Sequence, residues 1–192
     1  MNLEKLETLE NEMNTMKIGN VLCAGLLALI TTAATGCMSV EADIPDVEVT
    51  QRNLQFQGVP LAQLLGDVSV ARTFSQKHKK LDLPSGLDCQ VNALSVTLKA
   101  TSGIKDFAFL KALHVTMSDD VHQPVSIIDY SQPAGAAPGD ALTVESANPV
   151  NTLDQWKTDS ATFNVQVAGT LPPSSWTVDL VMHFAGSFKY SR

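Results

Sequence analysis

Three cysteines and four histidines are the side chains of this sequence that could bind a metal or act as nucleophiles. The histidines are His78, His114, His122 and His183, and no two of them have the spacing of a zinc site such as HExxH. His114 and His183 fall at solvent-facing positions of predicted strands, where their imidazoles could approach one another if those strands were neighbours. We expect surface histidines rather than metal ligands.

Nucleophilic and acid–base catalysis have no recognisable motif in the chain. There is no GxSxG nucleophile elbow. The carboxylates fall mostly in predicted turns or at polar strand positions, where solvation accounts for them. The turn "SDDVHQP" carries Asp119, Asp120 and His122, but it lacks the regularly placed oxygens that a calcium site requires. The sequence therefore predicts no catalytic residue, no metal and no cofactor other than the lipid described below.

The segment "MKIGNVLCAGLLALITTAATGC", residues 16–37, has the layout of a secretory signal peptide. Lys17 supplies a positive charge, residues 21–30 are mostly apolar, and residues 31–36 are small. The apolar part is shorter than the ~20 residues of a comfortable membrane span. The alternative is an N-terminal membrane anchor that is never cleaved, which the missing stop-transfer pattern disfavours.

The end of this segment, Ala34-Thr35-Gly36-Cys37, resembles the lipobox of bacterial lipoproteins. The resemblance implies cleavage between Gly36 and Cys37, a diacylglycerol on the Cys37 sulfur and further acyl chains. The family favours Leu where this chain has Ala34. Met38 follows the cysteine rather than the Asp that retains enteric lipoproteins at the inner membrane. The resemblance therefore implies the outer membrane, on its periplasmic or cell-surface face.

These features divide the chain into four parts. Residues 1–15 are an acidic extension that fits a signal peptide poorly and is untranslated if synthesis begins at Met13 or Met16. Residues 16–36 are the signal peptide, 37–46 the lipidated cysteine with a short tether, and 47–192 the folded domain. The third cysteine, Cys89, is then alone in the domain. A buried, unreactive thiol is the favoured interpretation, and an intermolecular disulfide is the alternative.

Apolar residues alternate with polar ones along most of the domain, which predicts β-strands with one buried face. The clearest strands lie in 162–169 and 174–188, and the turn-rich "TLPPSS" between them predicts that they form an antiparallel hairpin. Short helical turns are expected over 59–67, 103–112 and 151–159. The fold class is therefore all-β, an antiparallel β-sandwich or jelly roll with a few helical turns, preceded by a signal-peptide helix. Further strands are predicted within 47–51, 68–74, 94–103, 113–120, 124–130 and 141–146.

Aromatic residues have mainly structural assignments in this sandwich. Phe107 and Phe109 are expected to plug one end, and Trp176 to lie in the core. Trp156 either anchors a short helix against the sheet, which is favoured, or offers an exposed ring to a sugar. The tracts "SVTLKATSGIKDFAFLKALHVTMSDD" and "VTQRNLQFQGVP" resemble uncharacterised β-sandwich lipoproteins of Gram-negative bacteria such as myxobacteria, and this resemblance implies no function.

One basic cluster stands out, "SQKHKK", with Lys77, Lys79 and Lys80 around His78. We call these three lysines the lysine cluster. An exposed charged loop is the favoured interpretation. The alternative is contact with anionic lipid headgroups or lipopolysaccharide phosphates, which a short tether would bring close.

The chain carries a net charge of −7, which excludes nucleic acid as a partner because such proteins present a basic face. The leading functional hypothesis is a non-enzymatic, lipid-anchored envelope protein whose β-sandwich has a structural or protein-interaction role. Its partners would be the membrane, through the lipid, and an envelope protein. The alternatives are a module that binds a glycan or lipid and, third, an envelope hydrolase.

Overall fold

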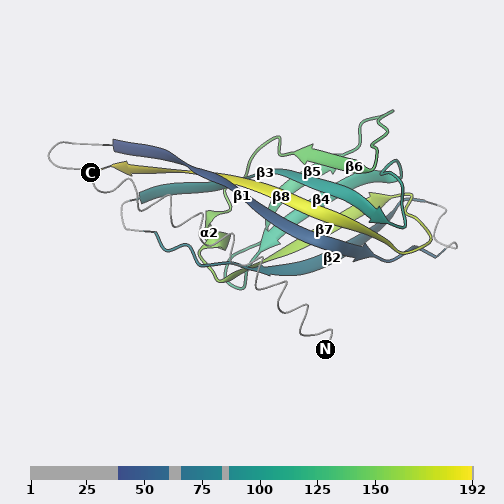
Figure 1. The fold of residues 1–192 in the computed structure, drawn as a ribbon, viewed down its shortest axis with the longest axis horizontal. Coiled ribbons are helices and arrows are strands. Elements are labelled where there is room, and N and C mark those ends of the chain that lie inside the picture. Colours follow the sequence, from purple (N-terminus) through teal and green to yellow (C-terminus); the bar gives the residue numbers. More distant parts are fainter. Residues whose placement is uncertain (1–38, 61–65, 84–86, 192) are drawn as a thin grey trace.

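Within the residues that the structure describes, the alternating sequence pattern builds eight strands in two facing antiparallel sheets (Figure 1). The structure is a computed structural model that describes residues 39–60, 66–83 and 87–191. Sheet A has the order β1-β8-β3-β6, and sheet B has the order β2-β7-β4-β5. The predicted all-β sandwich class is confirmed. The strands of sheet A are β1 (Ser39–Phe56), β8 (Trp176–Ser191), β3 (Leu87–Ser102) and β6 (Ala141–Glu145), and those of sheet B are β2 (Val68–Lys77), β7 (Ser160–Gly169), β4 (Leu110–Ser118) and β5 (Val125–Ser131).

The core lies between the sheets and is formed by the inward-facing residues of each strand. On β8, alternate residues from Trp176 to Phe184 are at most 1 % exposed, as their period of two predicts. Across the core, the Phe163 ring of β7 lies 6.4 Å from the Phe184 ring of β8. Burial of these two apolar faces is the main stabilising contribution to such a fold.

Four aromatic residues close one end of the sandwich. Phe56 at the end of β1 stacks on Trp176 at the start of β8, with 4.3 Å between ring centroids. Phe109 meets Trp176 edge-on at 5.4 Å, and Phe107 lies 6.2 Å from Phe109. The prediction that Phe107 and Phe109 plug one end is confirmed. Gly103 turns the chain beside this plug with a φ of +79°.

The predicted hairpin between the last two strands is wrong. β7 pairs with β2 and β4 in sheet B, whereas β8 pairs with β1 and β3 in sheet A. The connecting segment crosses from one sheet to the other, and its backbone groups bond to other loops. Val59 donates to the carbonyl of Pro172, and Thr170 donates to the carbonyl of Phe109. A period of two identifies the buried face of a strand but not the strand that lies beside it.

Residues 39–46, assigned to a tether from the sequence, are part of β1. They pair with the end of β8, from Ser39 opposite Ser191 to Ile44 opposite Gly186. Pro45 lies where the register shifts between Ile44 and Val47. Because β1 is an edge strand of sheet A, a proline there removes no hydrogen bond that a second neighbour would need. The sheet therefore begins two residues after Cys37.

The ends of β1, β8 and β3 extend beyond the strands of sheet B as a three-stranded ribbon (Figure 1). Among its described inward residues, Val91 and Cys89 on β3 and Phe188 on β8 are apolar and buried. We call this part of sheet A the ribbon.

Of the three predicted helical turns, one is present and one is wrong. The helix α2 (Leu153–Trp156) lies within 151–159. Residues 103–109 form bends and a turn without a helix, and β4 already begins at Leu110. Residues 61–65 of the third turn lie outside the described residues, as do the extension, the signal peptide, Gly36 and Cys37. In the described part of the chain, no helix has the length and apolar character to cross a membrane.

Candidate functional site

The candidate site residues gather at the end of the sandwich where β1 begins. We call it the proximal end, because Cys37 precedes β1 by two residues. Here β8 and β2 end, β3 and β7 begin, and α2 and the β4–β5 turn close the sandwich (Figure 1). The aromatic plug lies at the opposite, distal end.

Residues 78–83 cross the proximal end as an irregular segment that we call the strap. Its backbone is tied at two points: the His78 N–H donates to the carbonyl of Asp159, and the Leu81 N–H donates to the carbonyl of Trp156, both at 3.0 Å. Leu81 and Leu83 are partly buried against the core. The strap therefore covers apolar surface of the ribbon where sheet B has ended.

A cavity of about 10 Å³ lies beneath the strap, which is roughly the space of one water molecule. It is too small for a sugar or an acyl chain. Its position shows that Leu81 of the strap faces the ribbon. The lining residues are Val47, Lys79, Leu81, Val91, Trp156, Ala185 and Gly186.

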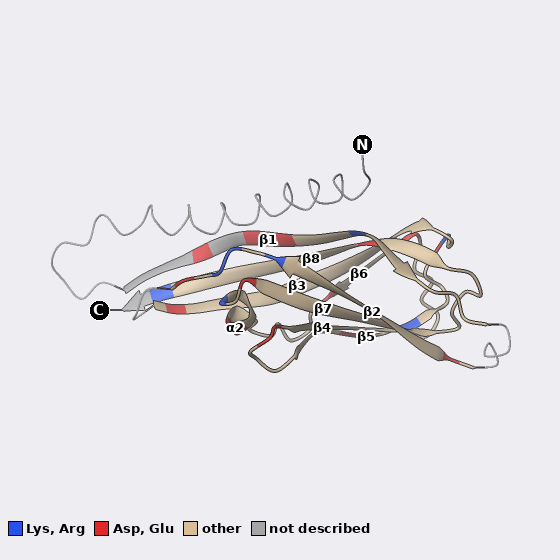
Figure 2. Ribbon diagram, turned by 90° about the horizontal axis from the view of Figure 1, so that it is seen from below, with Lys and Arg blue, Asp and Glu red and all other residues tan. Residues whose placement is uncertain are grey.

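The lysine cluster lies at this same end, with all three residues exposed. Lys80 forms an ion pair with Asp82 at 3.7 Å. Blue and red segments both occur at this end in Figure 2, so the proximal end carries charges of both signs. The prediction of an exposed, charged segment holds for the lysines, but not for the histidine between them.

His78 is buried, with 6 % of its surface exposed. Its ring lies 4.8 Å from the Trp156 ring, and its Nδ1 lies 3.4 Å from the carbonyl oxygen of Lys79. Among the described residues, its Nε2 has no hydrogen-bond partner. Burial lowers the pKa of His78 below 6.5, against the opposing influence of the Lys79 carbonyl and the Asp159 and Asp119 carboxylates.

The burial of His78 differs from the exposed loop that the sequence predicts, although the sequence contains a signal for it. Even-numbered residues of β2, such as Val70 and Phe74, face the core. His78 continues this spacing one step beyond the end of the strand. The surrounding lysines concealed the pattern.

α2 is held to the sandwich by a buried polar network. Thr152 is fully buried; its Oγ1 donates to the carbonyl of Val91 at 2.8 Å and accepts from Trp156 Nε1 at 3.1 Å. The Trp156 ring meets Phe184 edge-on at 5.3 Å. Trp156 thus anchors the helix against the sheet, as the favoured interpretation predicted, and is not an exposed platform for a sugar. Trp176 lies in the core as predicted.

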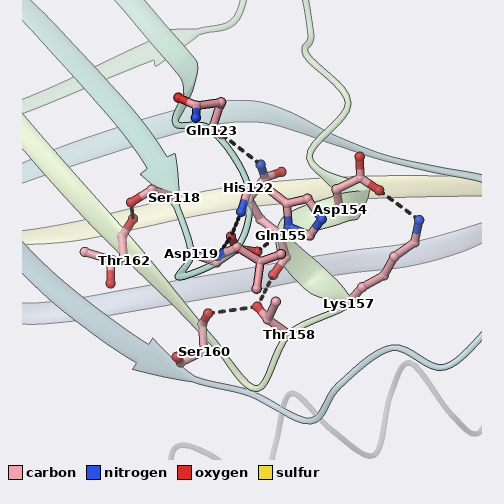
Figure 3. Close-up of polar contacts among 11 residues, drawn as sticks. Ser118, Asp119, His122, Gln123, Asp154, Gln155, Lys157, Thr158, Ser160 and Thr162 are labelled. Atoms are coloured by element: carbon pink, nitrogen blue, oxygen red, sulfur yellow. Dashed lines mark hydrogen bonds and ion pairs between the residues drawn. The ribbon is translucent and has the colours of Figure 1, made fainter.

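The β4–β5 turn contains an aspartate–histidine pair (Figure 3). The Asp119 carboxylate, whose side chain has no exposed surface, accepts the Val121 N–H at 2.9 Å and contacts His122 Nδ1 at 2.7 Å. Burial by itself raises the pKa of Asp119, but the hydrogen bonds from His122 and Val121 outweigh it and lower the pKa overall. In the same view, Lys157 pairs with Asp154 of α2 at 2.8 Å.

This pair fixes the orientation of an imidazole, an arrangement that acid–base catalysis can use. Catalysis would need a nucleophile or substrate group at the other ring nitrogen. Among the hydrogen bonds of the described residues, the His122 ring contacts only Asp119. The carboxylate oxygens already accept protein donors, so the pair has the features of a structural turn.

The strands of His114 and His183 are not neighbours, so the condition for an approach of the two imidazoles is not met. His114 lies on β4 of sheet B and His183 on β8 of sheet A, and both point outward, so they lie on opposite outer faces. His114 Nδ1 instead pairs with Asp129 Oδ1 on β5 at 2.8 Å. Over the described ranges, no three histidine, cysteine or acidic side chains are grouped so that they could hold a metal ion.

Cys89 is buried and has no disulfide partner among the described residues. Its side chain lies on the inward face of the ribbon opposite Phe188. Burial raises the pKa of its thiol, and the nearby Asp88 carboxylate acts in the same direction. These properties match the favoured interpretation of a buried thiol, since the reactive form is the thiolate.

No protein family and no curated protein matches this chain. Solved structures match at low identity. One is the family 32 carbohydrate-binding module of C. perfringens NanJ in complex with galactose, 7 % identical over 76 % of this chain and 99 % of that one, with a TM-score of 0.33. Others are the decameric BFDV capsid protein, 8 % identical over 81 % and 100 % (TM-score 0.34), and the Drosophila NLP core, 13 % identical over 62 % and 97 % (TM-score 0.25). Similarity at this level carries no information about ligands or partners.

Proposed function

We propose that this protein is a non-enzymatic lipoprotein of the outer membrane, anchored through acylated Cys37. Its β-sandwich would serve an envelope structure or bind an envelope protein. Several acyl chains, each contributing ~0.8 kcal/mol per buried CH₂, would hold the domain stably at the bilayer.

The observation that carries the proposal is the start of β1 at Ser39. Only Met38 separates Cys37 from this strand, so the acylated residue would lie within about 7 Å of the sheet. The proximal end, with the strap and the lysine cluster, would then face the lipid headgroups. The distal end would point away from the membrane.

An interaction role is supported by the open edges of the sheets. β1 is an 18-residue edge strand of sheet A, and the unpaired backbone groups of an edge strand can accept a strand from another protein. The exposed Asp43, Asp46 and Glu48 interrupt this edge with charge, which would restrict pairing to a complementary partner.

The two alternative functions have less support. A glycan-binding module would need an exposed aromatic platform or a pocket, whereas Trp156 is buried and the cavity beside it holds about one water molecule. A hydrolase would need a substrate cleft at the Asp119–His122 pair, and His122 contacts only Asp119 among the described residues. Binding of a defined glycan or lipid by the protein, or hydrolysis that His122→Gln abolishes, would favour these alternatives.

The anchor can be tested by labelling with radioactive palmitate in a Gram-negative host. Cys37→Ala should abolish labelling and leave a longer, unprocessed precursor. Cys23→Ala and Cys89→Ala are the matched controls, because they remove the other two thiols and should leave labelling intact. A processed, membrane-bound Cys37→Ala protein would contradict the proposal.

A further inference from the structure

We propose that His78 is a pH-sensitive latch, which keeps the strap closed over the ribbon when neutral and releases it when protonated. This inference concerns the folded domain and is independent of the proposed lipid anchor.

Only a few contacts attach the strap to the rest of the domain, and the strap opens when they break. Two backbone hydrogen bonds, from His78 and Leu81, fix it to the turn around α2. The His78 ring against Trp156 and the partly buried Leu81 and Leu83 complete the attachment. Segments with few buried contacts open locally while the rest of a domain stays folded. The small cavity next to Leu81 further reduces the packing of the strap on the ribbon.

The ring of His78 is shielded from water, but its two nitrogen atoms do not both have a hydrogen-bond partner among the described residues. It is buried, its Nδ1 reaches a single carbonyl oxygen at 3.4 Å, and its Nε2 has no partner among the described residues. A protonated ring carries an N–H on both nitrogens. Protonation in the closed state would therefore leave a charged donor buried without an acceptor, a costly arrangement.

Other charged groups surround the latch and moderate this effect. Asp159 follows α2, and Asp119 lies in the β4–β5 turn; both carboxylates favour the protonated ring, but burial outweighs them, so the pKa of His78 is lowered. Other titratable groups on the neighbouring elements are Lys77 at the end of β2, Lys79, Lys80 and Asp82 of the strap, Asp154 of α2 and Lys157 directly after it, Asp120 and His122 of the turn, and Asp88 and Cys89 at the start of β3.

The direction of the pH response follows from proton linkage. When the strap is open, His78 is solvated and titrates near its ordinary value of 6.5. When the strap is closed, it titrates lower. Protons therefore bind preferentially to the open state, and the opening equilibrium constant rises as the pH falls below 6.5, by at most about tenfold per pH unit for one proton. Well above pH 6.5, where the ring is neutral in both states, the constant should level off.

Opening can be measured by hydrogen–deuterium exchange of the full-length protein in detergent. The protection factor of a peptide spanning 78–83, corrected for intrinsic exchange at each pH, should fall several-fold between pH 6.5 and 5.5. Peptides from β7 in the core should not change. His78→Gln and His78→Leu should flatten the response, whereas the matched controls His114→Gln and His122→Gln should retain it.

Cys89 provides a second readout, because it lies on the covered side of the ribbon. In the full chain with Cys23→Ser and Cys37→Ser it is the only thiol. Its labelling rate, divided by that of the urea-unfolded protein at the same pH, should rise in parallel with strap exchange. A flat wild-type profile, a response that survives in the folded His78 variants, or equal loss of protection in β7 would overturn the proposal. If neither His78 variant folds, the pH profiles of strap protection in the wild type and in His122→Gln test the proposal, and both should show the same fall between pH 6.5 and 5.5.

Discussion

Thr152→Val tests the polar network that positions α2 and, through it, the strap. The two side chains have nearly the same shape, so the change removes the hydroxyl without opening a cavity. Trp156 Nε1 then loses its acceptor inside the protein, where Trp156 is only 4 % exposed. An unsatisfied buried donor costs ~1–3 kcal/mol, and loss of a hydrogen bond costs ~1 kcal/mol.

The cost of losing the hydrogen bond from the Thr152 hydroxyl to the Val91 carbonyl is partly offset in the structure. The Val91 carbonyl, which loses the Thr152 hydroxyl, also accepts the backbone N–H of Thr152 at 2.6 Å and so keeps a partner. The unsatisfied Trp156 N–H is therefore the main cost, and we expect a loss of about 1–3 kcal/mol in the free energy of unfolding. This is a large part of the ~5–15 kcal/mol that stabilises an ordinary domain.

Urea unfolding followed by circular dichroism measures this loss. Thr97→Val is the matched control, because Thr97 bonds Thr143 at 2.9 Å on the exposed face of sheet A and should change stability by at most ~0.5 kcal/mol. Trp156→Phe removes the orphaned N–H. In the Thr152→Val background it should therefore cost ~1–3 kcal/mol less than in the wild type. Equal effects of Thr152→Val and Thr97→Val, or strictly additive effects in the double variant, would refute the reasoning.

Two further predictions concern the distal and proximal ends. At the distal end, Gly103→Ala should destabilise the protein by about 2–4 kcal/mol, because φ is +79° and the added Cβ would lie 2.5 Å from the Ser175 carbonyl oxygen. Gly139→Ala, which meets open space, should cost no more than ~0.5 kcal/mol in the same urea titration; equal costs would contradict the assigned close approach. At the proximal end, replacing the whole lysine cluster by serine should weaken binding of the non-acylated Cys37→Ala chain to anionic vesicles, since each lysine near such a surface contributes ~1 kcal/mol. Unchanged binding would contradict a contact between the lysine cluster and anionic lipid headgroups.

The aromatic residues show how much of the packing was predictable. Burial of Trp176 and the plug of Phe107 and Phe109 followed from their places in alternating strands and at a corner. The anchoring of α2 by Trp156 was also the favoured interpretation. In each case the local sequence pattern determines which face is apolar, and the hydrophobic effect buries that face.

His78 shows where local patterns fail for the site. Its neighbours Lys77, Lys79 and Lys80 are exposed, and composition alone placed His78 with them. Its burial depends on Trp156, which is 78 residues further along the chain and meets it only because α2 docks at the end of β2. The spacing along β2 indicates that His78 faces inward, but its contact with Trp156 has no signature in the sequence near either residue.

Residue order alone was enough to predict the fold class and the inward face of each main strand, and it is the basis of the hypothesis of a signal peptide that ends before Cys37. Each of these predictions uses residue order over a short stretch: a period of two indicates a strand with one buried face, and an apolar run indicates a segment that leaves water. Three-dimensional packing alone shows that β7 and β8 lie in different sheets, that β1 begins at Ser39, and that His78 is buried at the start of the strap. These features depend on which strands pair over long separations, and the free energy of that choice is spread over the whole core.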